Sequence, residues 1–212
     1  MLPRPKLLLF DLDGVLARYE RTLRVRQLAA VVGGDEADVH AALFGRNGLE
    51  LRSDRGEIDL PQYLDLLREQ HGWNVTTDDF LAARRAATRV DPAMLALCEA
   101  LAPQAALGIF TNNGAWFGES ARRLVPELSP LFGRRFVCSG SLGVLKPMPE
   151  AYVACLQQLG FNALSTLCID DRADNVAGAL EAGLGGLVFA DPDSLRIALR
   201  AFDFDLETDD AS

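Results

Sequence analysis

The sequence has few lysines and no excess of positive charge. Only two of its 212 residues are lysine, Lys6 and Lys146, and the formal net charge at pH 7 is -9. Proteins that bind the phosphate backbone of nucleic acids need a basic face that displaces counterions. We therefore expect no nucleic-acid partner, and any positive charge that contacts a phosphate must be local.

A long hydrophobic run is also missing near the start of the chain. The first apolar run covers only residues 7–10, whereas a helix that spans a membrane needs about 20 apolar residues. A signal peptide needs an apolar stretch of about 7–15 residues. We therefore expect no membrane partner and a cytoplasmic location.

Cysteines are few, and no two of them form a C-x-x-C pair. The four are Cys98, Cys138, Cys155 and Cys168, each in an apolar stretch. This pattern favours buried free thiols over a disulfide framework or a zinc site. With 49% hydrophobic and 24% charged residues, the chain has the composition of an ordinary globular protein. Its length suffices for one large core, or for a core with a small appended domain.

What the sequence does have is an apolar run that ends in two carboxylates and a glycine. In residues 6–16, KLLLFDLDGVL, the run predicts a parallel strand that is buried on both faces. Asp11 and Asp13 follow it, two positions apart, and their mutual repulsion calls for a cation. Oxygen ligands suit a hard ion such as Mg²⁺. The alternative interpretation is a surface turn, because Asp and Gly are common turn formers.

The pattern between residues 19 and 89 is helical. We expect helices over 22–32, 36–44, 60–71 and 78–88, with glycine-rich turns between them. No run in this stretch resembles a strand. The pattern therefore predicts a small all-helical insert after the first strand.

From residue 91 onward, helices and strands alternate. The expected strands are 105–110, 134–138, 166–169 and 186–189, and the expected helices are 91–101, 116–124, 149–159, 175–182 and 193–201. Such alternation predicts right-handed crossovers and a parallel sheet, with ligands bound beyond the carboxyl ends of the strands.

The polar clusters of the sequence all fall at those carboxyl ends. They are Asp11 with Asp13, Thr111 to Asn113, Lys146, and Asp170 with Asp171. Taken singly, Thr111 and the Asp170 pair are each explained by helix capping. Together, four separate parts of the sequence are predicted to meet on one edge of one sheet.

These motifs, in this order, resemble those of the haloacid dehalogenase-like (HAD) hydrolase superfamily. D-x-D-G is followed by a strand that ends in Thr-Asn, then by Lys-Pro before a helix, and then by Asp-Asp-x-x-x-Asn. The resemblance implies an α/β fold: a doubly wound, Rossmann-like parallel sheet of about five strands, with a small helical cap inserted after the first strand. The core would be residues 1–16 and 91–206, the cap 17–90, and 207–212 a flexible acidic tail. Residues 55–58 and the motifs around Lys146 and Asp170 are most similar to sugar-phosphate phosphatases and to the N-terminal phosphatase domain of epoxide hydrolases.

The resemblance also implies a role for each matching residue. Asp11 would be the nucleophile and form an aspartyl-phosphate, and Asp13 would be the general acid and then the general base. Thr111 and Asn112 would bind the phosphoryl oxygens, and Lys146 would neutralise their charge. The ligands of a Mg²⁺ cofactor would be Asp11, the backbone carbonyl of Asp13, and Asp170 or Asp171, with Asp171 the direct ligand and Asp170 water-mediated; Asp174 and Asn175 would support them.

The favoured activity is Mg²⁺-dependent hydrolysis of a small phosphate ester, with sugar phosphates ahead of phosphoglycolate and nucleotides. Asp13 and the Asp170 pair argue against a dehalogenase, which works without a metal. A phosphomutase or another phosphotransferase would share every residue of the site, and a non-catalytic binding protein on the same fold is a further alternative. Candidate contacts to the rest of the substrate are Arg18, Tyr19, Arg46, Arg55 and Trp116.

Overall fold

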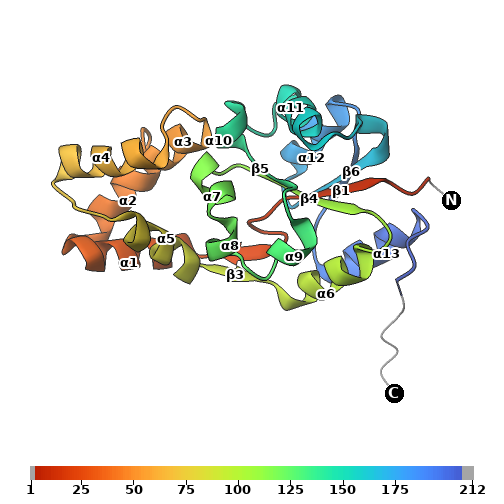
Figure 1. Ribbon diagram of the computed structural model, residues 1–212, viewed down its shortest axis with the longest axis horizontal. Helices are drawn as coiled ribbons and strands as arrows, with labels where there is room; N and C mark the ends of the chain where they lie inside the picture. Colours follow the sequence, from red (N-terminus) through yellow and green to blue (C-terminus); the bar gives the residue numbers. More distant parts are fainter. Residues whose placement is uncertain (1–2, 207–212) are drawn as a thin grey trace, which may run out of the picture.

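A five-stranded parallel sheet runs through residues 3–206, the part of the chain that the computed structural model describes (Figure 1). Its strand order is β5-β4-β1-β6-β7, and every neighbouring pair is parallel. The strands are β1 Leu7–Phe10, β4 Ala106–Thr111, β5 Phe136–Cys138, β6 Thr166–Asp170 and β7 Gly185–Val188. The fold class predicted from the alternation of strands and helices is confirmed.

Strand β1 is apolar throughout because both of its faces are covered. It lies between β4 and β6, and all four of its side chains are buried. Leu7 and Leu9 pack in one hydrophobic cluster, and Leu8 and Phe10 pack in another. Successive side chains of a strand point to opposite faces, so this one strand contributes to the core on both sides of the sheet.

Helices cover the two faces of the sheet. Helices α11 (Pro149–Leu159) and α12 (Ala173–Glu181) pack on the face of Leu7, and α6 (Pro92–Leu101) and α13 (Pro192–Arg200) pack on the face of Leu8 (Figure 1). Shorter helices complete the connections: α7 Ala115–Glu119, α8 Ala121–Leu124, α9 Ser129–Phe132, α10 Ser139–Leu142 and the 3-10 helix η1 Ala163–Ser165. The single helix predicted over 116–124 is therefore wrong, because α7 ends at Glu119 and Ser120 separates it from α8.

A helical layer lies at one end of the sheet (Figure 1). It consists of α1 Arg21–Val32, α2 Glu36–Phe44, α3 Leu49–Asp54, α4 Leu60–His71 and α5 Thr77–Ala86. Tyr63 and Phe80, at helical spacing among apolar residues, are fully buried in it. Helix α3 was not among the predicted helices. The division of the chain into a core and a cap at residues 17 and 90 stays a prediction.

Two short strands flank this layer, and the helical pattern did not predict them. Strands β2 (Ala17–Tyr19) and β3 (Thr88–Val90) form an antiparallel pair. Thr88, predicted as helical, pairs with Tyr19 instead. Each strand has three residues, which is too short for a period to emerge, and the partner of each lies about 70 residues away in the sequence. The layer is thus joined to the sheet by two adjacent chain segments.

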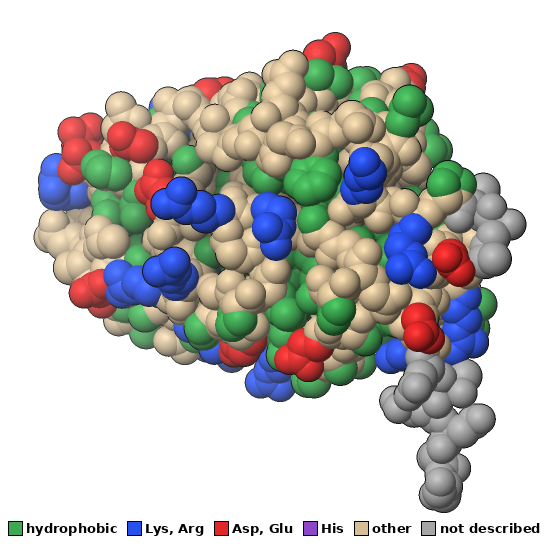
Figure 2. All heavy atoms as spheres, turned by 45° about the vertical axis from the view of Figure 1, so that its right-hand side comes forward, with side chains coloured by type: hydrophobic (Ala, Val, Ile, Leu, Met, Phe, Trp, Pro, Cys, Tyr) green, Lys and Arg blue, Asp and Glu red, His purple; other side chains and the backbone are tan. Residues whose placement is uncertain are grey.

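Several expectations from composition can be compared with the described residues. All four cysteines are free and buried. None of the described helices combines the length and the apolar character needed to cross a membrane. On the face shown in Figure 2, lysine and arginine side chains are scattered among acidic and uncharged ones. The predicted acidic tail, 207–212, lies outside the described residues.

Candidate active site

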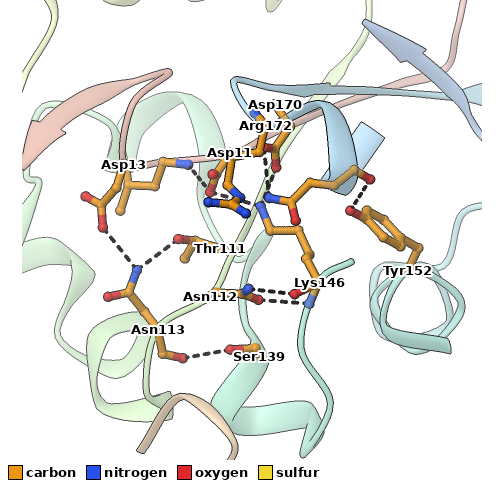
Figure 3. Close-up of polar contacts among 12 residues, drawn as sticks. Asp11, Asp13, Thr111, Asn112, Asn113, Ser139, Lys146, Tyr152, Asp170 and Arg172 are labelled. Carbon is orange, nitrogen blue, oxygen red and sulfur yellow. Dashed lines mark hydrogen bonds and ion pairs between the residues drawn. The ribbon is translucent and has the colours of Figure 1, made fainter. Parts of the chain in front are cut away.

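The predicted site residues meet at the carboxyl end of the sheet (Figure 3). Asp11 follows β1, Thr111 is the last residue of β4 and Asp170 is the last residue of β6. Because β1 pairs in parallel with both β4 and β6, the three strands deliver these side chains to the same edge. Lys146 reaches the edge from the loop that precedes α11.

Lys146 lies between two carboxylates. Its Nζ is 3.1 Å from Asp11 Oδ1 and 2.6 Å from Asp170 Oδ2, and the residue is 4% exposed. Burial would lower the pKa of Lys146, but the charges of Asp11 and Asp170 outweigh burial and raise it. The lysine therefore stays charged, and it compensates part of the negative charge at this edge.

Asp11 is buried among these groups and titrates abnormally. Burial raises its pKa from the ordinary 3.8 to about 6; Lys146 lowers the pKa, and the charge of Asp170 raises it further. Asp11 Oδ1 also accepts a hydrogen bond from the backbone N–H of Leu12 at 2.7 Å. A buried carboxylate that is held in place and poised near neutral pH is typical of a catalytic group.

Asp170 and its neighbour Asp171 lie in different surroundings. Asp170 is fully buried, and both of its oxygens accept hydrogen bonds: Oδ2 from Lys146, and Oδ1 from Asn175 Nδ2 at 2.9 Å and from the backbone N–H of Arg172 at 3.0 Å. Asp171 is exposed, and burial together with the charge of Asp170 raises its pKa. Asp171 therefore has the more accessible carboxylate.

Three carboxylates at this edge can converge on one cation. Oxygen atoms of Asp11, Asp170 and Asp171 lie within 4.8 Å of one another. Gly14 makes room for this group: its φ is +101°, and a Cβ there would lie 2.5 Å from Asp171 Oδ2. The donor set and the raised pKa values of Asp11 and Asp171 fit a hard divalent ion, which would relieve the repulsion.

Asp13, in the loop after β1, faces an arginine of the helical layer. Arg84 Nη2 donates to Asp13 Oδ2 at 2.6 Å. Asn113 Nδ2 lies 3.4 Å from the same oxygen and donates to Thr111 Oγ1 at 2.9 Å. The neutral amide of Asn113 thus links the predicted acid to the predicted phosphate ligand (Figure 3).

The side chain of Asn112 forms hydrogen bonds with the backbone of Lys146. Its Nδ2 donates to the Lys146 carbonyl at 2.9 Å, and its Oδ1 accepts from the Lys146 N–H at 3.0 Å. This pair of hydrogen bonds joins the end of β4 to the loop that carries Lys146. The side chain of Asn112 therefore fixes the position of the lysine.

Of the candidate substrate contacts, Trp116 is buried and Tyr19 is half-buried. Trp116 is 3% exposed and donates its Nε1–H to Ser53 Oγ at 3.1 Å. Tyr19 lies under Arg84, whose guanidinium carbon is 3.6 Å from the centre of the ring. Arg84 itself was not predicted as a functional residue. A signal was present, since Arg84 follows the buried Phe80 by four positions and so shares the apolar face of α5.

A pocket opens on the helical layer near this edge. It has a volume of about 240 Å³, and its lining residues are Arg21, Leu43, Phe44, Gly45, Glu50, Leu51 and Asp54. Ser139, at the carboxyl end of β5, donates its hydroxyl to the Asp54 carbonyl at 2.7 Å. Burial and the charge of Glu50 raise the pKa of Asp54, and the charge of Asp13 raises it further. The pocket therefore lies close to the carboxyl edge of the sheet.

Comparison with known proteins identifies the family to which these features belong. A family model for haloacid dehalogenase-like hydrolases matches residues 5–183. A phosphatase of Mycobacterium tuberculosis is 30% identical over 185 residues, which cover 82% of each chain. A chloroplast flavin mononucleotide hydrolase of Arabidopsis thaliana is 40% identical over 88 residues, or 41% of this chain; the match spans 34% of that relative's length.

A solved structure supports the fold. A HAD family enzyme of Bacteroides thetaiotaomicron, in complex with magnesium and inorganic phosphate, is 22% identical and has a TM-score of 0.70. The alignment covers 90% of this chain and 98% of that one. The similarity covers both the sheet and the helical layer.

Proposed function

This chain belongs to the haloacid dehalogenase-like hydrolase family, and from that premise we propose that it is a Mg²⁺-dependent phosphatase of small phosphate esters. The observation that carries the proposal is the position of Asp11: buried, hydrogen-bonded, next to Lys146, and within reach of two further carboxylates. Such an arrangement provides a nucleophile beside a cation site. The enzyme would transfer the phosphoryl group first to Asp11 and then to water.

In the first step, a carboxylate oxygen of Asp11 would form a bond to phosphorus while the bond to the leaving oxygen breaks. Asp13 would give its proton to that oxygen, so that a neutral alcohol departs. In the second step, Asp13 would take a proton from water as the water attacks phosphorus. The bond between Asp11 and phosphorus then breaks and inorganic phosphate leaves. Each group ends in the protonation state in which it began.

The other site residues would stabilise charge. Lys146 and the Thr111 hydroxyl would contact the phosphoryl oxygens, on which the negative charge of the transition state is spread. Asn112 and Asn113 would hold these two groups in place through the hydrogen bonds described above. These are roles of position and electrostatics, which dominate phosphoryl transfer.

We propose that Asp11, Asp171 and the backbone carbonyl of Asp13 would bind Mg²⁺ directly. Asp170 would contact the ion through a water molecule. When bound, the ion would supply positive charge to the phosphoryl oxygens. Two observations support this assignment. Both oxygens of Asp170 already accept hydrogen bonds, whereas Asp171 is exposed. The Bacteroides structure that shares this fold was solved with magnesium and phosphate.

For the substrate we favour a sugar phosphate. The pocket of about 240 Å³ on the helical layer has the size of a small organic group, and Arg21, Glu50 and Asp54 offer hydrogen-bonding groups to hydroxyls. A second candidate is flavin mononucleotide, because a hydrolase of that ester is 40% identical to part of this chain. The flavin ring system is larger than a sugar, so the pocket of about 240 Å³ has less room for it.

The experiment is phosphate release from a panel of esters, with Mg²⁺ or with EDTA. The panel contains hexose phosphates, phosphoglycolate, flavin mononucleotide, nucleoside monophosphates and p-nitrophenyl phosphate. We expect release that disappears with EDTA and in Asp11→Asn, while the exposed control Asp38→Asn keeps the wild-type rate. Isomerised sugar phosphate without free phosphate would indicate a phosphomutase. No turnover of any ester by folded, Mg²⁺-loaded protein would refute the proposal.

A further inference from the structure

One contact at the site crosses from the helical layer to the sheet. Arg84 lies on α5 and Asp13 lies in the loop after β1, 71 residues earlier, yet Nη2 and Oδ2 are 2.6 Å apart. Arg84 is 1% exposed. Its guanidinium lies over the ring of Tyr19 at 3.6 Å and near the ring of Phe117 at 4.8 Å. The arginine is thus held by neighbours and has little freedom to turn away.

The two oxygens of Asp13 have different surroundings. Oδ2 accepts from Arg84 and lies 3.4 Å from the amide nitrogen of Asn113. Oδ1 is buried and has no hydrogen-bond partner among the described residues. A buried carboxylate oxygen without a partner is unfavourable, so the contacts on Oδ2 are what hold this side chain in place.

We infer that Arg84 is a positioning residue, which holds the carboxyl group of Asp13 in one orientation at the site through its contact with Oδ2. The inference rests on the proposed function. From this fixed orientation Asp13 would give a proton to the leaving oxygen and would later accept the proton of the attacking water. A carboxyl group that carries a proton on one oxygen still accepts a hydrogen bond on the other, so the contact with Arg84 can persist through both steps.

Because Arg84 lies on α5, its contact with Asp13 also links the helical layer to the site. Helix α5 packs against α1 and α8, and the chain runs on from α5 through β3 to α6. The orientation of Asp13 therefore depends on the position of a helix in the layer that also carries the pocket. A shift of α5 relative to the sheet would withdraw Arg84 and release the side chain of Asp13.

The competing explanation is that the Arg84–Asp13 ion pair only stabilises the fold. A comparison of two ester substrates distinguishes this explanation from a positioning role. p-Nitrophenolate is a good leaving group and departs without a proton, whereas the alkoxide of a sugar phosphate must be protonated as it leaves. The parameter to compare is kcat/KM, which reports on the steps up to release of the alcohol. Loss of proton donation lowers kcat/KM for the sugar ester far more than for the aryl ester. Loss of folding or of phosphate binding lowers both equally.

The test variants are Arg84→Met and Arg84→Lys, measured with Mg²⁺ on both esters. Because general acid catalysis contributes about 100- to 10,000-fold, we expect Arg84→Met to lose about 10- to 100-fold more kcat/KM on the sugar ester than on the aryl ester. Arg84→Lys keeps the charge and should recover part of that difference. The control is Arg85→Met, which removes the neighbouring, half-buried arginine that pairs with Glu127, and it should leave both values unchanged.

A double-mutant cycle with Asp13→Asn completes the test. If Arg84 acts through Asp13, adding Arg84→Met to Asp13→Asn should lower kcat/KM on the sugar ester no further. An equal loss on both esters, or full additivity in the cycle, overturns the inference while the phosphatase function stands. A wild type that turns over neither ester refutes the function itself. If Arg84→Met does not fold, Arg84→Lys carries the same comparison.

Discussion

Replacing Asp11 with asparagine should stabilise the metal-free protein at neutral pH while it abolishes catalysis. The site places the carboxylates of Asp11 and Asp170 around a single lysine, and both are buried. One lysine balances one carboxylate, so the second carboxylate is an uncompensated buried charge until a cation binds. Asparagine keeps the shape of Asp11 and the acceptor oxygen for the Leu12 N–H, and it removes the charge.

The size of the effect follows from the pKa of Asp11. Burial raises this pKa from 3.8 to about 6, so the folded protein binds the proton more tightly than the unfolded chain does. The stability that the proton provides is fully present below pH 4 and is lost as the pH rises through 6. Asparagine resembles the protonated acid at every pH. We therefore expect Asp11→Asn to exceed the wild type by about 3 kcal/mol in free energy of unfolding at pH 8, and by an amount that falls toward zero near pH 4.

Urea unfolding in EDTA at a series of pH values between 4 and 8 measures this difference. Asp38→Asn, at an exposed position of α2, is the control and should stay within about 0.5 kcal/mol of the wild type. Saturating Mg²⁺ should reduce the advantage of Asp11→Asn, because the ion binds the folded wild type. A wild type that is more stable than Asp11→Asn at pH 8 in EDTA, or a difference that is independent of pH, would refute the reasoning.

Two further substitutions test the site. Lys146→Met leaves the buried carboxylates without their cation; we expect a loss of about 3–5 kcal/mol in urea unfolding at pH 8, and a stabilised Lys146→Met would contradict this. Gly14→Ala places a Cβ against Asp171 Oδ2, so the Mg²⁺ concentration for half-maximal activity should rise. Gly33 also has a positive φ, +64°, with nothing within 4 Å; Gly33→Ala should carry a backbone strain of about 1–2 kcal/mol but keep the wild-type Mg²⁺ dependence. Equal Mg²⁺ dependence in the two glycine variants would contradict the role of Gly14 in making room for Asp171.

The sheet and its edge could be predicted because their signals are local. The run Leu7–Phe10 is apolar throughout since β1 is buried on both faces, and the turn residues after each strand mark its carboxyl end. Once the strands are parallel, topology alone brings Asp11, Thr111 and Asp170 to one edge. The same rule does not reveal which atoms of these residues touch.

What the sequence did not reveal depends on contacts between distant segments. Strands β2 and β3 are three residues each and exist because they pair with one another. The hydrogen bonds between Asn112 and Lys146 join residues 34 apart, and the contact of Arg84 with Asp13 joins residues 71 apart. No local period encodes such pairs. Only the position of Arg84 on the buried face of α5 hinted at a partner in the interior.

The central claim is that the phosphoryl group is transferred to Asp11 before it is transferred to water. The reaction of Asp13→Asn with p-nitrophenyl phosphate tests this claim directly. The good leaving group needs no proton, so the first step should proceed, whereas hydrolysis of the intermediate lacks its base and should slow. After rapid mixing with Mg²⁺ and acid quenching, we expect about one p-nitrophenolate per enzyme in a burst, with a phosphoryl group on the peptide that carries Asp11. Steady release of p-nitrophenolate with no burst and no phosphoryl group on that peptide would contradict the account.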